Sequence, residues 1–167
     1  MKRHSVEKDI LLQTITQLAD VLQFKQYCLA TAESCTGGWI AKLCTDLPGS
    51  SNWFECGFVT YSNRAKHDML EVSDDTLHAY GAVSEDVVAE MVRGAIANSH
   101  ANVALAVSGI AGPSGGTTLK PVGTVCFAWL LPETGIQTVT RQLQGDRNAI
   151  REQAVIFALR ELLVLLD

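Results

Sequence analysis

The stretch CLATAESCTGGWIAKLCTD, residues 28–46, predicts a strand, a tight turn and a helix in succession. Residues 28–32 form a short apolar run that is typical of a buried strand. Residues 36–46 carry apolar side chains at helical spacing and predict a helix, which Pro48 and Gly49 end. The adjacent glycines Gly37 and Gly38 let the backbone turn sharply or approach a ligand closely. This strand-turn-helix unit is typical of an α/β fold.

Helices and strands continue to alternate along the rest of the chain. Further helices are predicted over residues 7–23, 63–69, 73–80 and 84–100 and from Asp146 onward, with Ser84 and Asp146 as expected N-caps. Further strands are predicted over residues 54–61, 103–107, 122–131 and 136–144. This order predicts an α/β fold over residues 1–167, namely a single-domain three-layer α/β/α sandwich with a mixed, mostly parallel sheet. Because ligands bind beyond the carboxyl ends of strands in such sheets, the turn at Ser34 and the loop from Ser108 are expected to share one edge.

Composition and charge narrow the class of protein. With 167 residues, 47% of them apolar and 19% charged, the chain can form one globular domain with a sizeable core. The net charge of −5 argues against nucleic-acid binding. No apolar run reaches the roughly 18 residues of a membrane span, and residues 1–9 are polar, unlike a signal peptide. We therefore expect a cytoplasmic protein with no nucleic-acid or membrane partner.

The cysteines and histidines predict no metal site. The five cysteines are widely spaced without a CxxC motif, and the four histidines are scattered. Reduced thiols fit a chain without a secretion signal, and zinc sites need ligands at closer spacing. No metal and no other cofactor is expected.

The predicted turn carries two possible nucleophiles beside a helix N-terminus. Ser34 or Cys35 can act as the nucleophile, because the N–H groups and partial positive charge of a helix N-terminus stabilise a developing oxyanion. Cys35 competes with Ser34 because thiols ionise more readily than hydroxyls. The alternative is structural, with Ser34 or Thr36 capping the helix. The residues alone leave these alternatives open.

A lysine follows the predicted strand over residues 54–61. In Tyr61-Ser62-Asn63-Arg64-Ala65-Lys66 the strand ends and a short helix begins. A lysine that is partly stripped of water loses some preference for its charged form, and it can then act as a general base toward a serine hydroxyl. The alternative is a solvated surface lysine, as most lysines are.

Two further segments have the character of anion-binding sites. The loop of residues 108–116 has four glycines directly after a predicted buried strand, and successive backbone N–H groups in such loops form anion-binding concavities. The alternative is a flexible connection. Arg147 and Arg151 lie near the start of the last predicted helix, where a cation opposes the helix dipole. They either hold a phosphate together with the helix end or lie exposed on the surface.

Together, these segments resemble the CinA C-terminal-domain family, and in particular its stand-alone nicotinamide-nucleotide amidases. The motifs occur in the same order as in that family, over residues 31–38, 48–51, 59–66, 81–85, 108–113, 115–116 and 120–125. The resemblance runs from about residue 7 to the C-terminus, and it departs from the family pattern at Ser114, where an acidic residue is usual. The longer members carry an additional N-terminal nucleotide-processing domain, for which this chain has no room.

The resemblance implies a metal-free hydrolysis of the carboxamide of nicotinamide mononucleotide to nicotinate mononucleotide and ammonia, in pyridine nucleotide recycling. It makes Ser34 the nucleophile and Lys66 its base, places Tyr61 near the substrate, and implies a homodimer or higher homo-oligomer. The other expected substrate-binding residues are Glu33, Cys35, Thr36, Gly37, Ser108, Gly109, Gly112, Gly116, Lys120, Arg147 and Arg151. Two competing hypotheses are a non-catalytic nucleotide-binding or regulatory module of the same fold and a hydrolase that uses Cys35.

Overall fold

The computed structural model describes residues 2–167, with side chains from residue 10 onward. All the predicted helices and strands occur in the described residues, with bounds that differ from the predicted ones by a few residues. In chain order the elements are α1 (Lys2–Phe24), β1 (Leu29–Glu33), α2 (Trp39–Asp46), a short 3-10 turn (Ser50–Asn52), β2 (Phe54–Val59), α3 (Asn63–Leu70), α4 (Asp74–Tyr80), α5 (Glu85–Ala97), β3 (Val103–Gly109), β4 (Thr124–Leu131), β5 (Gly135–Gln142) and α6 (Arg147–Leu166).

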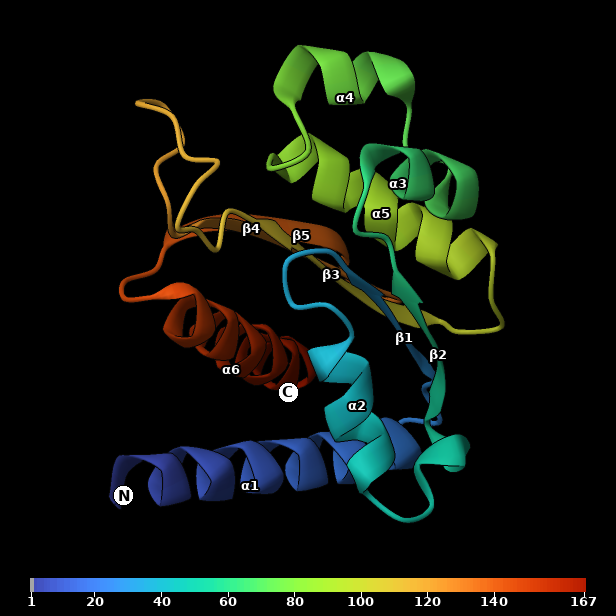
Figure 1. Cartoon of the computed structure of the whole chain (residues 1–167). Coiled ribbons are helices and arrows are strands. Elements are labelled where there is room, and N and C mark those ends of the chain that lie inside the picture. The colour runs from blue at the N-terminus through green and yellow to red at the C-terminus, as the bar shows by residue number, and fades with distance from the viewer. Residues whose placement is uncertain (1) are drawn as a thin grey trace.

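The five strands form one mixed sheet in the order β2-β1-β3-β4-β5. Strand β1 pairs in parallel with β2 and β3, while β4 is antiparallel to both β3 and β5. Strand β4 is therefore antiparallel to the other four strands, which are parallel to one another. Figure 1 shows α1, α2 and α6 on one side of the sheet and α3, α4 and α5 on the other. The predicted three-layer α/β/α sandwich with a mostly parallel sheet is confirmed.

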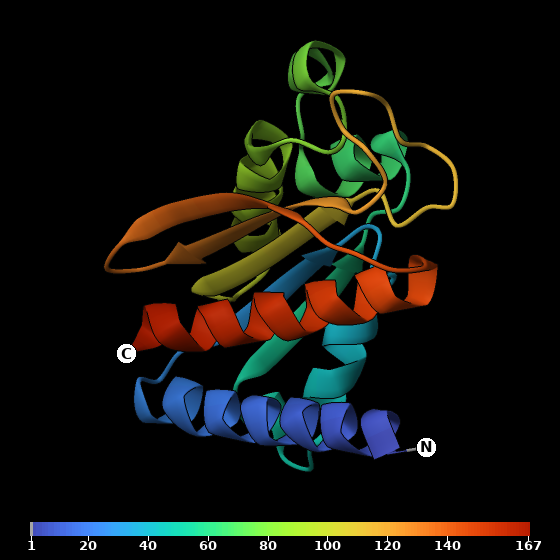
Figure 2. The same cartoon turned by 90° about the vertical axis from the view of Figure 1, so that its left-hand side faces the viewer.

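The two faces of the sheet carry side chains of different size, because alternate residues of a strand point to opposite faces. The face toward α6 carries large side chains, among them Leu29, Leu105, Val107, Phe127 and Trp129. The face toward α5 carries mainly alanines, namely Ala30, Ala32, Ala104, Ala106 and Ala128. Small side chains let α5 lie close to the sheet. On the other face α6 covers the sheet, and α1 packs outside it, as Figure 2 shows.

Local sequence accounts for most of the helix ends. Ser84 and Asp146 cap α5 and α6 through their side-chain oxygens, as predicted. Helix α2 begins at Trp39 and not at residue 36, because Gly37 and Gly38 adopt left-handed backbone angles with φ of +66° and +91°. The turn before α2 is therefore longer than predicted.

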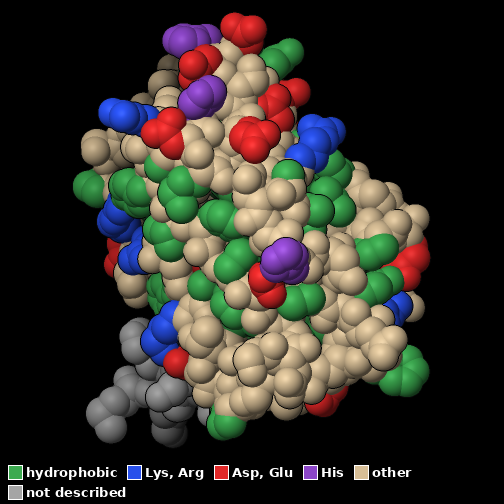
Figure 3. All heavy atoms as spheres, turned by 90° about the vertical axis from the view of Figure 1, so that its right-hand side faces the viewer, with side chains coloured by type: hydrophobic (Ala, Val, Ile, Leu, Met, Phe, Trp, Pro, Cys, Tyr) green, Lys and Arg blue, Asp and Glu red, His purple; other side chains and the backbone are tan. Residues whose placement is uncertain are grey.

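Helix α4 extends beyond the sheet at the top of Figure 1. Its first turn holds Asp74 and Asp75, and its last turn holds His78. Acidic side chains and histidines accordingly gather at the upper end of the face in Figure 3. Among the helices of residues 2–167, none combines the length and apolar character needed to cross a bilayer.

Candidate active site

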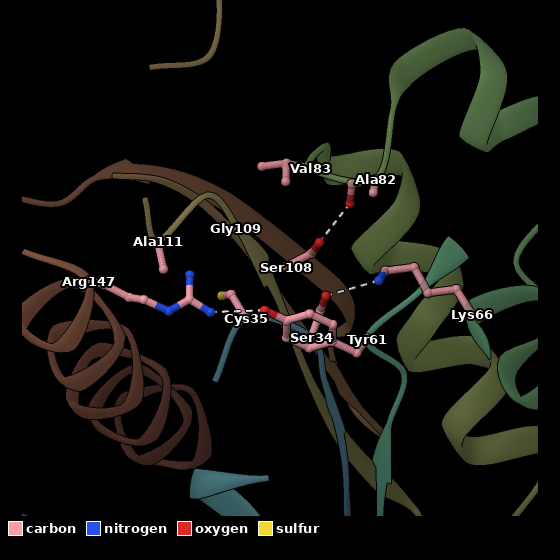
Figure 4. A pocket seen from close by; sticks show the side chains of 10 residues that line it. All are labelled: Ser34, Cys35, Tyr61, Lys66, Ala82, Val83, Ser108, Gly109, Ala111 and Arg147. Atoms are coloured by element: carbon pink, nitrogen blue, oxygen red, sulfur yellow. Dashed lines mark hydrogen bonds between the residues drawn. The ribbon is translucent and has the colours of Figure 1, made fainter. Parts of the chain in front are cut away.

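The register of the three parallel strands brings their carboxyl ends to one line. Glu33, the last residue of β1, lies opposite Val59 of β2 and Val107 of β3. Ser34, which follows β1, and Ser108, near the end of β3, therefore meet at the same edge, as predicted. They line a cavity of about 200 Å³ together with residues of α3, α6 and the loop before α5, as Figure 4 shows. The lining residues are Ser34, Cys35, Tyr61, Lys66, Ala82, Val83, Ser108, Gly109, Ala111 and Arg147.

Lys66 and Ser34 meet at the base of this cavity. The Lys66 Nζ donates to Ser34 Oγ at 2.9 Å and to the carbonyl oxygen of Thr60 at 2.8 Å. Ser62 caps α3 by accepting from the Ala65 N–H, which fixes the first turn of the helix that carries Lys66. Lys66 is completely buried, so the alternative of a solvated surface lysine is wrong.

The environment of Lys66 favours its neutral form. Burial removes water from the ammonium and lowers the pKa of Lys66 from 10.5 to about 8. The Thr60 carbonyl accepts one N–H, which leaves the nitrogen lone pair of a neutral Lys66 free for the Ser34 hydroxyl. At slightly alkaline pH the pair can thus transfer a proton from serine to lysine.

The carboxylate of Glu33 organises the turn that holds Ser34. It accepts hydrogen bonds from the backbone N–H of Gly38, Ile40 and Ala41 and from the hydroxyl of Thr36, at 2.7–3.1 Å. Glu33 thereby caps α2 from six residues before its first residue, and the negative charge suits the helix N-terminus. The alternative in which Ser34 or Thr36 caps the helix is wrong, because neither hydroxyl accepts from a helix N–H.

Backbone N–H groups remain available beside the Ser34 hydroxyl. Gly37 N–H donates to the Ser34 carbonyl, but within the described residues the N–H groups of Cys35 and Thr36 have no acceptor. The Cys35 side chain is buried, and burial raises the pKa of its thiol to about 11. A thiol that stays protonated at neutral pH is a weaker candidate nucleophile than a serine hydrogen-bonded to a lysine.

The opposite wall of the cavity carries a positive charge. Arg147, the first residue of α6, donates to the Gly112 carbonyl at 2.8 Å and to the Tyr61 hydroxyl at 2.9 Å. Figure 4 shows its guanidinium pointing toward Tyr61, across the cavity from Lys66. Ser108 is buried and donates to the carbonyl oxygen of Ala82 at 2.7 Å. The site thus joins a serine-lysine pair to an exposed arginine and tyrosine.

Several predicted substrate-binding residues do not line this cavity. Glu33 and Thr36 are occupied in the α2 cap, and Lys120 donates to the carbonyls of Tyr80 and Val83. Arg151 donates to the backbone of the turn and lines a separate hollow. The predicted residues outside the cavity lining are Glu33, Thr36, Gly37, Gly112, Gly116, Lys120 and Arg151.

Sequence reasoning assigned no role to three of the lining residues, Ala82, Val83 and Ala111. They are small apolar residues without chemistry of their own, so only their position in space marks them. Among the described side chains no group of three or more His, Cys, Asp or Glu residues is arranged to hold a metal ion.

Comparisons with known proteins agree with this architecture. Residues 12–166 match the CinA C-terminal domain. The chain is 50% identical over 152 residues to the nicotinamide-nucleotide amidohydrolase PncC of Escherichia coli K12, covering 91% of this chain and 92% of the relative. It is also 50% identical over 157 residues to the PncC of Pseudomonas putida, covering 94% and 98% of the two chains.

Solved structures show the same fold. The crystal structure of a CinA superfamily protein from Escherichia coli superposes with a TM-score of 0.90 at 39% identity, over 93% of this chain and 90% of that chain. The competence/damage inducible protein CihA from Agrobacterium tumefaciens superposes with a TM-score of 0.90 at 40% identity, over 95% and 96%. With one family matching nearly the whole length and the same fold in its solved structures, this chain belongs to the CinA C-terminal domain family.

Proposed function

We propose that the chain hydrolyses the carboxamide of nicotinamide mononucleotide to nicotinate mononucleotide and ammonia, through an acyl-enzyme formed on Ser34. The observation that carries this proposal is the 2.9 Å contact between Ser34 Oγ and the Nζ of the fully buried Lys66. The names of the PncC relatives support the reaction and the substrate, and the relatives cover most of both chains.

The first step transfers a proton and forms a bond. Neutral Lys66 takes the proton of the Ser34 hydroxyl while Oγ attacks the carboxamide carbon. The carbonyl double bond opens, and its electron pair becomes an oxyanion. The Cys35 N–H, which has no acceptor among the described residues and belongs to a residue of the cavity lining, is our candidate to receive that charge. In other enzymes the loss of one such donor costs about 3 kcal/mol.

The second half of the reaction uses the same lysine in reverse. The protonated Lys66 gives its proton to the carboxamide nitrogen, the carbon–nitrogen bond breaks, and ammonia leaves. A water molecule then replaces ammonia, and Lys66 removes its proton as it attacks the acyl-enzyme. Nicotinate mononucleotide is released and Ser34 recovers its proton from Lys66. Splitting one difficult hydrolysis into two steps suits a poor electrophile such as an amide.

The phosphate of the substrate needs an anchor away from the reacting carbon. Ligand pockets commonly enclose roughly 300–1,000 Å³, and the cavity of about 200 Å³ is smaller than that. We therefore place the carboxamide end inside and the ribose phosphate along the rim, where Arg147 and Tyr61 lie. Arg147 is suited to a phosphate because its guanidinium offers planar paired donors.

The wider setting is part of the same proposal. We place the enzyme in the cytoplasm, where it returns nicotinamide mononucleotide to pyridine nucleotide synthesis, and we expect it to act as a homodimer or larger homo-oligomer. It needs no metal.

An ammonia-release assay tests the function. Purified protein is incubated with nicotinamide mononucleotide, free nicotinamide and the dinucleotide, with a chelator present. We expect release from the mononucleotide, and a loss of more than about 10³-fold in Ser34→Ala and in Lys66→Met. Ser51→Ala and Lys42→Met serve as matched surface controls and keep full activity. Binding of the mononucleotide without any release would favour the regulatory module instead, and full activity in Ser34→Ala would exclude Ser34 as nucleophile.

A further inference from the structure

Arg151 has hydrogen bonds that substrate binding does not explain. Its Nε donates to the carbonyl oxygen of Cys35 at 3.0 Å, and its NH2 group donates to the carbonyl oxygen of Thr36 at 2.9 Å. Its guanidinium also lies 5.5 Å from the ring centre of Trp39. Arg151 is therefore held in place against the turn, where it lines a hollow separate from the cavity that Ser34 lines.

Within residues 10–167, whose side chains are described, no carboxylate neutralises the charge of Arg151 by forming an ion pair with its guanidinium. An arginine in the second turn of α6 also opposes the helix dipole, so the helix gains nothing from it. The positive charge therefore acts mainly on the two carbonyl groups that it contacts.

Those two carbonyls belong to peptide groups that directly follow Ser34 and Cys35, two residues of the cavity lining. The Cys35 carbonyl shares its peptide group with the Thr36 N–H, and the Thr36 carbonyl shares its peptide group with the Gly37 N–H. A cation at a carbonyl oxygen draws electron density from the peptide nitrogen, and hydrogen bonds in series strengthen one another in this way. The Gly37 N–H, polarised in this way, donates to the Ser34 carbonyl and holds the turn closed. The Ser34 carbonyl shares its peptide group with the Cys35 N–H, which has no acceptor among the described residues and belongs to a residue of the cavity lining. The Cys35 N–H therefore becomes a stronger donor.

We infer that Arg151 is a positioning residue for the amidase reaction: it orients the turn of residues 35–37 and, through the Gly37 N–H, polarises the Cys35 N–H that receives the oxyanion. This inference rests on the proposed function. It differs from a substrate contact because Arg151 acts through the backbone and touches neither the scissile bond nor the phosphate. A residue of this kind stabilises the transition state more than the bound substrate, so its loss lowers kcat and leaves KM nearly unchanged.

The test compares Arg151→Met, Arg151→Lys and Arg151→Gln with the surface control Arg160→Met on the same helix. We expect Arg151→Met to lower kcat by roughly ten- to a hundredfold, below the 10²–10³-fold of a deleted donor, with KM within about twofold. Arg151→Lys keeps the charge and should fall between Arg151→Met and the wild type. Arg160→Met should match the wild type. An unchanged kcat in Arg151→Met, or a raised KM with kcat intact, would overturn the inference.

A transition-state analogue gives a readout without turnover. A pyridine boronic acid forms a tetrahedral adduct on a serine Oγ, and its boronate oxygen occupies the oxyanion position. Calorimetric affinity for this probe should fall in Arg151→Met by the same factor as kcat, and an unchanged affinity would overturn the inference. If wild-type protein binds the probe but releases no ammonia, the proposed function fails while the polarisation by Arg151 is still measured. If Arg151→Met does not fold, the comparison of Lys with Gln decides: Gln equal to or better than Lys overturns the inference.

Discussion

Replacing Lys66 by methionine is expected to abolish activity and yet to raise the free energy of unfolding at pH 7. Burial lowers the pKa of Lys66 from 10.5 to about 8. At about 1.4 kcal/mol per pH unit, keeping this ammonium buried costs the folded state about 3 kcal/mol at pH 7. Methionine removes that cost but leaves the Ser34 hydroxyl and the Thr60 carbonyl without the lysine, which costs about 1–3 kcal/mol. The net gain at pH 7 is on the order of 1 kcal/mol.

The pH dependence of the stability difference between the wild type and Lys66→Met tests this reasoning more directly than its value at pH 7. Between pH 8 and 10.5 the unfolded chain still binds a proton at Lys66 that the folded protein has released, so raising the pH stabilises the folded wild type relative to the variant. Between pH 7 and pH 10 the free energy of unfolding of the wild type should rise by about 2.5 kcal/mol relative to that of Lys66→Met. The exposed Lys42, replaced by methionine in the same way, should show no such trend.

Urea unfolding at pH 7, 8, 9 and 10 measures these differences directly. A difference between wild type and Lys66→Met that does not change with pH would mean that Lys66 is charged in the folded state throughout, and it could not then serve as the base. The kcat/KM of the wild type should rise with pH through about 8, because only neutral Lys66 accepts the serine proton. A flat profile across that range would refute the same reasoning.

Four further outcomes follow from the contacts of single residues. Cys35→Ala should keep most of the activity if serine is the nucleophile, and loss of ammonia release in this variant with the fold intact would restore Cys35 as the candidate nucleophile. Glu33→Gln should lower the free energy of unfolding by about 3 kcal/mol in urea titrations, because a carboxylate that accepts four hydrogen bonds is replaced by an amide that presents a donor. Gly94→Ala should lower the free energy of unfolding by more than about 3 kcal/mol, because the added Cβ would lie 1.9 Å from the Leu70 carbonyl oxygen. A thermal melt should show this as a large drop in the midpoint temperature. Arg147→Met should raise KM for nicotinamide mononucleotide about tenfold or more with little change in kcat, whereas an unchanged KM would remove Arg147 as the phosphate anchor.

The sequence was informative wherever a pattern is local. The alternation of the apolar runs predicted the helices and strands in their order, and the side-chain caps at Ser84 and Asp146 were predicted from residue type. The α2 start was misplaced because two successive left-handed glycines lengthened the turn, and residue type alone does not say which backbone angles a glycine adopts. The ordered motifs also indicated the family, which brought Ser34 and Lys66 together before any distance was known.

The sequence by itself therefore determined the order of elements and the family, and it named the serine and the lysine. Only the tertiary structure decided which groups surround these side chains and what the surrounding residues do. Lys66 lies in α3, a helix whose polar sequence is typical of the protein surface. It is buried because α3 packs on α5 beside the strand ends. Arg147 and Arg151 are four residues apart on α6, yet one faces the cavity and the other the backbone of the turn. Burial and hydrogen-bond partners come from segments far apart in the chain, and local patterns carry no information about them.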